Sequence, residues 1–373
     1  MTRVNLRLPG PTPVPEDVIQ AMSQPMIDHR GAAFHDIMRR VTANLQRAFE
    51  TTTEVYVLTA SGTGGMEAAL VNVLSPGDRV LAVSIGSFGD RFSTMAKVYG
   101  ARVTDLKFPE GQAADPAQIR ARLQADPAIK AVLITHNETS TGITNDLEAI
   151  ARVVKGEFDR LLIVDAISSL GSIRLAMDAW QVDVVVSASQ KGWACPPGLA
   201  MIALSARAWQ ACDTATMPRF YFDLREARRS LNKGETPWTP AVGLIYGLDH
   251  ALQQMLARGD MTATYQFHAR IAQYTRDGLT QLGLKLVATD LKYASNTVTA
   301  CYLPEGVTDS ALLTMLMQDY NIVAAEGRGL LAGKCFRIGH MGYVTAQDID
   351  AVLAALQQAL PRLGGKPAGA LAG

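Results

Sequence analysis

The chain of 373 residues has no excess of charge of either sign, because 35 Lys and Arg residues balance 35 Asp and Glu residues. A protein that binds nucleic acid or an anionic membrane non-specifically needs a basic surplus, so the sequence predicts neither partner. Apolar runs are also short, and none reaches the ~18 to 20 residues of a membrane-spanning helix. The N-terminal stretch MTRVNLRLPGPTPVP lacks the apolar segment of a signal peptide. We therefore expect a cytoplasmic protein.

Cysteine is scarce as well. A structural zinc site or a disulfide framework needs closely spaced cysteines, and this chain contains no CxxC pair. The pattern predicts free thiols in a reducing compartment and no metal site. The four cysteines are Cys195, Cys212, Cys301 and Cys335.

Apolar side chains are abundant, at 48% against 19% charged residues, which excludes a disordered chain and predicts a large core. Short runs of Val, Ile and Leu, typical of strands buried on both faces, alternate with amphipathic stretches. This alternation predicts an α/β fold with a mostly parallel sheet sandwiched by helices. The predicted strands are 79–85, 102–106, 131–135, 161–164, 182–187 and 199–204, and the predicted helices are 66–74, 91–99, 116–124 and 146–154.

The pattern changes after about residue 240. Two long helices are predicted at 240–257 and 261–282, followed by strands near 284–287, 297–302 and 336–338 and helices near 310–318 and 346–359. We therefore predict an N-terminal arm with a large domain over residues 1–258, a smaller α+β domain over 259–363 and a flexible tail over 364–373. A crevice between two such domains is a usual place for a cofactor.

A glycine-rich segment near the C-terminus imitates two nucleotide-binding motifs. Gly327–Ala332 fits the loose GxGxxA pattern, but a strand follows it instead of the helix that the dinucleotide motif requires. Gly329–Lys334 is one residue too short for a P-loop, and Cys335 stands where a Ser or Thr should bind magnesium. We interpret the segment as a loop that leads into a strand.

Three other features fall in order along the predicted sheet, and the first is TASGTGG at residues 59–65, directly before a helix. Free backbone N–H groups and the helix dipole make such an N-terminus an anion site, to which Ser61 and Thr63 add hydroxyl donors. By itself the segment fits an ordinary capped helix start equally well.

The other two features are charged residues at the ends of buried strands. Asp165 ends the run LLIVD, where a carboxylate needs a partner, either a protonated ring nitrogen or a helix start that it caps. Lys191 lies just beyond the next strand, where it either snorkels to the surface or forms a Schiff base with a lowered pKa. A phosphate cradle, an aspartate and a lysine 26 residues later together match the requirements of pyridoxal 5′-phosphate (PLP).

Longer motifs surround these residues. In chain order they are LPGPT at 8–12, SGTGGMEAA at 61–69, LSPGD at 74–78, HNETSTG at 136–142, DAISSLG at 165–171, SQKG at 189–192, PPG at 196–198 and FRIGH at 336–340. With these motifs, which span nearly the whole chain, the sequence resembles the class V aminotransferases of fold-type I. Within them it is similar to the alanine/serine–glyoxylate aminotransferases, in particular to cyanobacterial-type members, some of which carry the label of a soluble hydrogenase small subunit.

Carried over position by position, the resemblance implies roles for individual residues. Lys191 would form the Schiff base and move the substrate proton, Asp165 would bind the pyridine nitrogen, and Phe88 and Ile167 would lie on the two faces of the ring. Further cofactor contacts are implied for Ser61, Thr63, Gly64, Gly65, Thr139 and Gln190.

The resemblance also implies how substrate is held and how subunits associate. Arg337 would clamp the substrate α-carboxylate, with Gly10 and Thr139 beside it. In a homodimer with a composite active site, Thr236 and Thr239 would reach the phosphate of the neighbouring subunit. Two residues are candidates for narrowing the pocket, Trp193 and Trp238, and we interpret the basic stretch 225–233 as a solvated loop near its entrance.

The implied reaction transfers an amino group from alanine or serine to glyoxylate, giving glycine and a 2-oxo acid. Aspartate or phosphoserine stay open as donors. A cysteine desulfurase needs a nucleophilic cysteine on a mobile loop, for which Cys335 is the candidate, although it reads as part of a strand. A non-catalytic subunit of a hydrogenase is the third alternative, but the cysteines have no cluster-ligand spacing.

Overall fold

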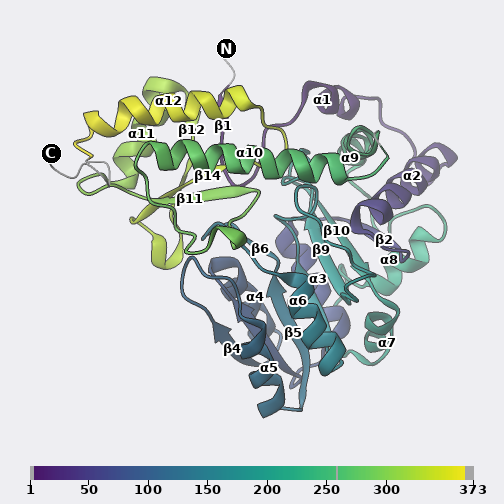
Figure 1. Ribbon diagram of the computed structural model, residues 1–373. Helices are drawn as coiled ribbons and strands as arrows, with labels where there is room; N and C mark the ends of the chain where they lie inside the picture. Colours follow the sequence, from purple (N-terminus) through teal and green to yellow (C-terminus); the bar gives the residue numbers. More distant parts are fainter. Residues whose placement is uncertain (1–3, 258, 366–373) are drawn as a thin grey trace.

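The computed structural model describes residues 4–257 and 259–365 of the chain, and a twisted sheet forms the centre of its larger part (Figure 1). The strands of this sheet are β2 (Val55–Thr59), β3 (Arg79–Ser84), β4 (Arg102–Lys107), β5 (Ile129–Thr135), β8 (Leu161–Asp165), β9 (Val184–Ala188) and β10 (Leu199–Leu204). Their order in the described residues is β2-β10-β9-β8-β5-β3-β4. Neighbours pair in parallel, except that β10 is antiparallel to both β2 and β9.

Helices cover both faces of the sheet, because its strands carry apolar side chains on both. In β8, Leu162 and Val164 belong to one core, whereas Leu161 and Ile163 belong to the other. The helices of the first core are α2 (Ala32–Phe49), α5 (Pro116–Ala125), α6 (Leu147–Ala151) and α9 (Val242–Leu256). Those of the second are α3 (Gly62–Val73), α4 (Ser87–Val98), α7 (Ala206–Thr214) and α8 (Leu224–Leu231). The predicted α/β fold with a mostly parallel sheet is confirmed.

Three helix predictions in this part are wrong in their bounds. Helix α3 begins at Gly62, four residues before the predicted start, so the glycine-rich segment forms its first turn. Helix α4 begins at Ser87, four residues before the predicted start, because the Glu138 carboxylate accepts the N–H groups of Phe88 and Gly89 at the first turn. Helix α6 ends early and continues as a π-helical segment over Arg152–Glu157.

The basic stretch 225–233 is not a loop. Residues Leu224–Leu231 form helix α8, whose first turn is capped by the Asp223 carboxylate accepting from the Arg225 N–H at 3.0 Å. Leu224 and Ala227 on its inner face are buried against the second core, which explains why the segment is helical despite its charge.

A separate core lies beneath the C-terminal helices, at the upper left of Figure 1. Helices α10 (Thr262–Gln281), α11 (Asp309–Tyr320) and α12 (Ala346–Arg362) pack there on a sheet of β11 (Val298–Tyr302), β14 (Cys335–Gly339) and β13 (Ala325–Glu326). The strand predicted at 284–287 is wrong, because this segment makes only an isolated bridge between Leu286 and Cys301. The helices predicted in this part are confirmed.

The N-terminal residues pack with this C-terminal part. Strand β1 (Asn5–Leu6) pairs in parallel with β12 (Ile322–Val323), and the Asn5 side-chain amide donates to the carbonyl oxygen of Asp348 at 2.8 Å (Figure 1). The domain boundary at 258/259 stays a prediction, and the predicted tail lies outside the described residues except for its first two.

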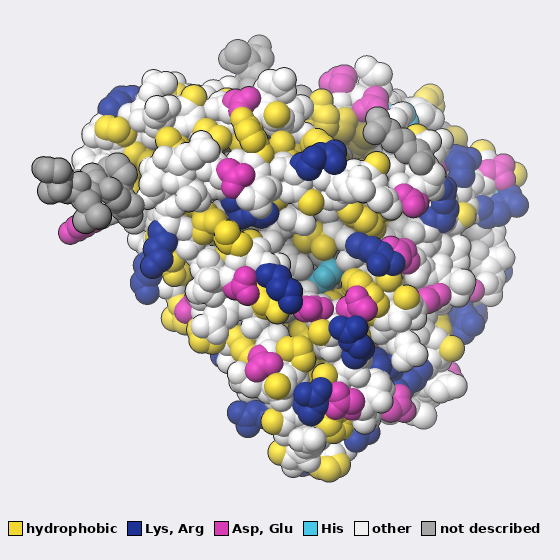
Figure 2. All heavy atoms as spheres, viewed as in Figure 1, with side chains coloured by type: hydrophobic (Ala, Val, Ile, Leu, Met, Phe, Trp, Pro, Cys, Tyr) yellow, Lys and Arg dark blue, Asp and Glu magenta, His cyan; other side chains and the backbone are white. Residues whose placement is uncertain are grey.

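Acidic and basic side chains are interspersed over the face that Figure 2 shows, in keeping with the zero net charge of the chain. A search of the described helices finds none with the length and apolar character that a bilayer crossing requires.

Candidate active site

A cavity of about 120 Å³ lies at the carboxyl ends of the parallel strands. Segments that follow β2, β3, β5, β8 and β9 meet there, because the carboxyl ends of parallel strands share one edge of a sheet. The side chains that line the cavity are Ser61, Gly62, Thr63, Met66, Phe88, Arg91, Asn137, Thr139, Asp165, Ile167, Ser168, Gln190 and Lys191. Eight of the residues predicted from the sequence are among them.

Lys191 lies against the N-terminal segment. Its Nζ donates a hydrogen bond to the carbonyl oxygen of Pro9. Gly10 has φ +95°, and a Cβ at this position would lie 2.5 Å from Lys191 Cδ, so only glycine permits the approach. Burial lowers the pKa of Lys191 to about 8, which Asp165 opposes and the nearby Arg337 reinforces. A larger fraction of such an amine is unprotonated at neutral pH than of an ordinary lysine, so more of it is available as a base and nucleophile.

Asp165 is the last residue of β8 and only 3% exposed. It accepts one hydrogen bond, from the Ile167 N–H at 2.9 Å. Burial raises its pKa to about 7, and the Glu138 charge adds to this effect. A protonated ring nitrogen would supply both a donor and a positive charge, and would return Asp165 to its ionised form.

The N-terminus of α3 lies beside these residues. The N–H of Gly65 makes the first bond of the helix, to the carbonyl of Ser61 at 3.1 Å, so the amides of Gly62, Thr63 and Gly64 precede the intrahelical ladder. The Ser61 side chain makes no capping hydrogen bond. This N-terminus therefore offers three amides and two hydroxyls to a phosphate.

Gly65 does not join that group. Its N–H is engaged within the helix, and a Cβ there would lie 2.8 Å from the Val186 side chain, so this residue faces the sheet. Gly64 packs between Ala60 and Phe222, and only its backbone is placed to contribute.

Arg337, in β14, reaches the same edge from the C-terminal part. Its Nε donates to the Glu326 carbonyl at 2.8 Å and one terminal nitrogen to the Thr139 carbonyl at 2.9 Å. The residue is 4% exposed. Burial and the neighbouring Arg328 lower its pKa to about 10, which leaves it positive at neutral pH. These two hydrogen bonds hold the guanidinium in a fixed orientation next to Thr139, which lines the cavity.

Sequence reasoning missed two charged residues of this site. Arg91 donates to the Thr63 hydroxyl at 3.3 Å, and its Cζ lies 4.8 Å from the centre of the Phe88 ring. Its spacing of three residues from Phe88 on one helix is a signal that could have found it. Glu138 accepts the N–H groups of Phe88 and Gly89, which fixes the backbone that carries the ring.

Besides Gly10, Gly64, Gly65 and Arg337, whose positions are given above, four predicted residues do not line this cavity within one chain. Thr236 and Thr239 line a separate hollow near Thr59, together with Trp238. Trp193 is wholly buried, where its indole nitrogen donates to the Ser187 hydroxyl at 2.8 Å. Contrary to the expectation from the sequence, neither tryptophan narrows the cavity of its own chain.

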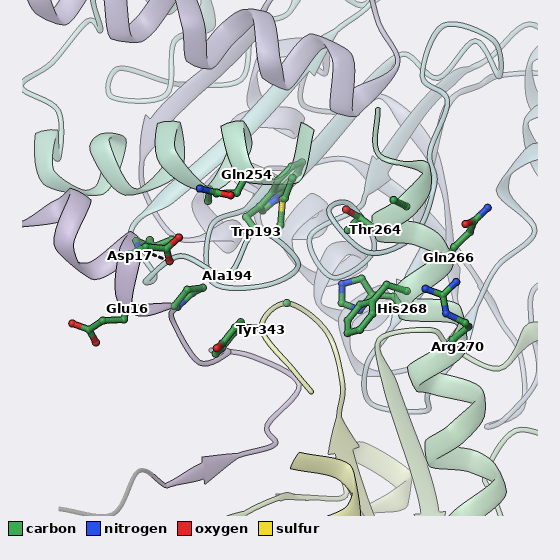
Figure 3. A pocket seen from close by; sticks show the side chains of 17 residues that line it. Glu16, Asp17, Trp193, Ala194, Gln254, Thr264, Gln266, His268, Arg270 and Tyr343 are labelled. Carbon is green, nitrogen blue, oxygen red and sulfur yellow. Dashed lines mark hydrogen bonds between the residues drawn. The ribbon is translucent and has the colours of Figure 1, made fainter. Parts of the chain in front are cut away.

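A larger cavity, of about 840 Å³, lies between α1 (Glu16–Met22), α9 and α10. Figure 3 shows its lining, in which Trp193 and Ala194 face His268 and Arg270 of α10. Lys191 does not line it, although Ala194 follows three positions later. The larger cavity therefore lacks the groups that converge on the smaller one.

Comparison with known proteins agrees with this geometry over most of the chain. Residues 4–352 match the family model described as Aminotransferase class-V. The chain belongs to the class-V aminotransferases. A Synechococcus sp. PCC 6716 protein named the small subunit of a soluble hydrogenase is 44% identical over 96% of this aminotransferase and 93% of its own length.

Two further relatives carry the names of aminotransferases. The L-aspartate–glyoxylate aminotransferase of Paracoccus denitrificans is 38% identical over 91% of this chain and 86% of its own. The crystal structure of an alanine–glyoxylate aminotransferase from Nostoc sp. superposes with a TM-score of 0.92 at 31% identity and covers 96% of both chains. The fold is therefore that of the fold-type I aminotransferases.

PLP is the cofactor of the class-V aminotransferases, and the residues of this one fit it. The buried Asp165 carboxylate has room for a donor besides Ile167. The Gln190 amide has an unpartnered buried oxygen in the described structure, so it is free to turn toward a ligand. Asp165 would hold the pyridine nitrogen, the α3 N-terminus the phosphate, and Lys191 the aldehyde carbon.

Proposed function

We propose that this class-V aminotransferase transfers the amino group of a small L-amino acid, alanine or serine, to glyoxylate, giving a 2-oxo acid and glycine. The observation that carries the proposal is Arg337, held against Thr139 at the cavity that Lys191 and Asp165 line. A fixed guanidinium matches the carboxylate that amino acids and 2-oxo acids share. The printed names of the Nostoc and Paracoccus relatives support glyoxylate as the acceptor.

The chemistry divides between cofactor and protein. PLP, when bound, supplies the electron sink that acidifies the Cα–H bond of the amino acid. Lys191 would take up the Cα proton of the donor and deliver it to the C4′ carbon of the cofactor, a role that suits an amine with a pKa of about 8. Asp165 keeps the ring nitrogen protonated, and Arg337 orients the α-carboxylate. Because donor and acceptor use the same groups, the 2-oxo product leaves before glyoxylate binds.

The proposal includes a homodimer with a composite active site. Phe220, Tyr221 and Trp238 form an aromatic surface in which the rings of Phe220 and Trp238 stack at 5.1 Å. Phe220 is 77% exposed and Tyr221 43%, so a second copy covering them would bury apolar area. Thr236 lies beside this surface, with its hydroxyl donating to the Trp238 carbonyl at 2.7 Å. We expect a dimer in sedimentation measurements, weakened by Phe220→Glu.

Two alternatives to an aminotransferase, a cysteine desulfurase and a non-catalytic hydrogenase subunit, are less well supported. Cys335 is the first residue of β14, and burial raises the pKa of its thiol to about 11, so it does not suit a desulfurase that needs a mobile thiolate. The convergence of Lys191, Asp165 and Arg337 favours an enzyme over a non-catalytic hydrogenase subunit. We propose a cytoplasmic location, supported by four buried free thiols.

Half-reaction spectra test the proposal. The protein is purified with PLP, and the absorption band of the lysine-bound cofactor is followed as L-alanine, L-serine, L-aspartate or L-cysteine is added separately, and then glyoxylate. The expected result is loss of the band with alanine or serine and its return with glyoxylate. A bound cofactor that no amino acid converts would contradict the transaminase proposal.

A further inference from the structure

Three guanidinium groups lie near Lys191, and one of them, Arg91, lines the smaller cavity. Arg91, Arg328 and Arg337 each lower the pKa of the Lys191 amine, which places all three near the reacting nitrogen. Two of them also lie over one ring, since the Cζ atoms of Arg91 and Arg328 are 4.8 and 6.0 Å from the centre of Phe88. Because Phe88 lines the cavity, Arg91 and Arg328 both lie beside one of its walls.

The protein itself supplies little negative charge to balance them. In residues 4–257 and 259–365, none of the three forms an ion pair with a carboxylate. The buried acid nearby, Glu138, is occupied: one oxygen accepts from the N–H groups of Phe88 and Gly89, and the other from the hydroxyl of Ser140 at 2.6 Å. Arg328 is exposed and has no carboxylate partner among the described residues, so its guanidinium is available to an anionic group of a ligand.

The proposed function accounts for two of these cations. Arg91 donates to the Thr63 hydroxyl at the N-terminus of α3, where the cofactor phosphate would lie. Arg337 is assigned to the substrate α-carboxylate, the group that every donor and acceptor carries. Arg328 is left without an anion when the donor is alanine or serine.

The position of Arg328 is set by its loop. The segment between β13 and β14 follows Glu326, whose carbonyl accepts from Arg337 Nε. It contains Gly329, where a Cβ would lie 2.8 Å from the Ser87 hydroxyl. The loop thus bridges Arg337 on one side and the first turn of α4 on the other. Arg328 lies between these contacts, exposed at the opening and next to the Phe88 ring.

We propose that Arg328 binds a second anionic group at the distal end of the amino donor, so that this enzyme prefers an acidic L-amino acid to alanine or serine. The proposal rests on the transamination with glyoxylate of the proposed function and replaces alanine or serine by an acidic amino acid as the preferred donor. A side-chain carboxylate, as in aspartate, and a phosphate ester, as in O-phosphoserine, are both matched by a guanidinium fork. The two sources share this chemistry and are separated by the test.

The first test compares donors in the PLP-loaded enzyme. We expect a higher kcat/KM for L-aspartate or O-phospho-L-serine than for L-alanine, and the better of the two acidic donors identifies the source of the anion. In R328Q the ratio of kcat/KM for the acidic donor to that for L-alanine should fall about 10- to 100-fold, mainly through KM. R328K should recover part of the loss. K334Q removes an exposed positive charge nearby and should leave the ratio unchanged.

The second test measures binding without turnover. Succinate and propionate differ by one distal carboxylate, and calorimetry on the loaded enzyme gives their Kd values. R328Q should weaken succinate by a similar factor relative to propionate, and added salt should reduce the difference. Equal losses for both ligands, or a wild-type enzyme that does not discriminate between them, would overturn the proposal. Failure of every donor would instead overturn the proposed function, while the succinate comparison would still decide the role of Arg328.

Discussion

The segment around Lys191 contributes residues to two cavities, which differ in volume and in the chemistry of their lining. Gln190 and Lys191 line the smaller, of about 120 Å³, whereas Trp193 and Ala194 line the larger, of about 840 Å³. Volume alone would favour the larger one as a ligand site. The chemistry favours the smaller one, because its lysine and aspartate have strongly shifted pKa values.

The two cavities also differ in how exposed the charged side chains at each of them are to water. Asp165 and Arg337 are 3% and 4% exposed, so desolvation shifts their pKa values and makes a matching ligand favourable. The charged residues of the larger cavity, such as Asp17, are exposed to water, and Asp17 already pairs with His250 at 3.0 Å. Desolvated charge without an ion-pair partner among the described residues therefore marks the candidate active site better than size does.

The largest expected effect is the loss of Lys191. Lys191→Ala removes the amine that we propose holds the cofactor and moves the substrate proton, so we expect kcat to fall by at least about 10⁴-fold. Gln254→Ala, on the wall of the larger cavity, should change kcat less than about twofold. Steady-state kinetics with glyoxylate measure both. A comparable loss in the Gln254 variant would break the distinction between the cavities.

The second prediction concerns the pH dependence of stability in the cofactor-free protein. The folded pKa of Asp165, about 7, lies above its ordinary 3.8, so the folded state holds a proton there that the unfolded state has lost. The free energy of unfolding should therefore fall as pH rises from about 4 to about 7, by about 4 kcal/mol from this group.

Asp165→Asn should flatten this pH slope, and urea denaturation at several pH values measures it. Glu138, whose pKa is also raised by burial, leaves a residual slope. The control is Asp17→Asn, because the hydrogen bond with His250 lowers the pKa of Asp17 and its contribution has the opposite sign. An unchanged slope in Asp165→Asn would mean that this carboxyl stays ionised without the cofactor.

The third prediction sharpens the role of the buried guanidinium. Arg337→Lys keeps the charge but loses the planar fork, so KM for the amino donor should rise about 30- to 300-fold with a smaller change in kcat. Arg270→Lys, in the larger cavity, provides the matched control and should leave KM unchanged. An unchanged KM in Arg337→Lys would show that a positive charge without the planar fork is enough to bind the donor carboxylate.

The smallest effect is expected at Glu138, a buried carboxylate whose two oxygens are fully used. Glu138→Gln places an NH₂ group against N–H donors of Phe88, Gly89 or Ser140, so the free energy of unfolding should fall by about 1 to 2 kcal/mol. Chemical denaturation measures this change, with the exposed Glu16→Gln as the control. Equal stability of the two variants would show that these hydrogen bonds contribute nothing net.

Much of the large α/β part could be predicted because its signals are local. The strands that end at Asp165 and precede Lys191 are continuous apolar runs, and their observed bounds differ by no more than two residues from the prediction. The prediction of a strand at 284–287 was wrong because an apolar run does not show whether a partner strand lies alongside it. The helix over 224–231 was missed because most of its residues are charged or polar. Only Leu224 and Ala227 are buried, which is too few to give a clear helical pattern of apolar residues.

The sequence by itself determined the main alternation of strands and helices from β3 to β10, the glycine-rich segment at the start of α3 and the placement of Asp165 and Lys191 at strand ends. It did not reveal α2, β2 or α7. Hydrophobic periodicity and the conformational freedom of glycine determine the local structure of only a few neighbouring residues, so they can be recognised directly in the sequence. Only the tertiary structure decided that Arg91, Glu138 and Arg328 join the same site and that Trp193 belongs to the core. These contacts depend on strand order and loop paths, which bring distant segments to one edge of the sheet and which no local pattern encodes.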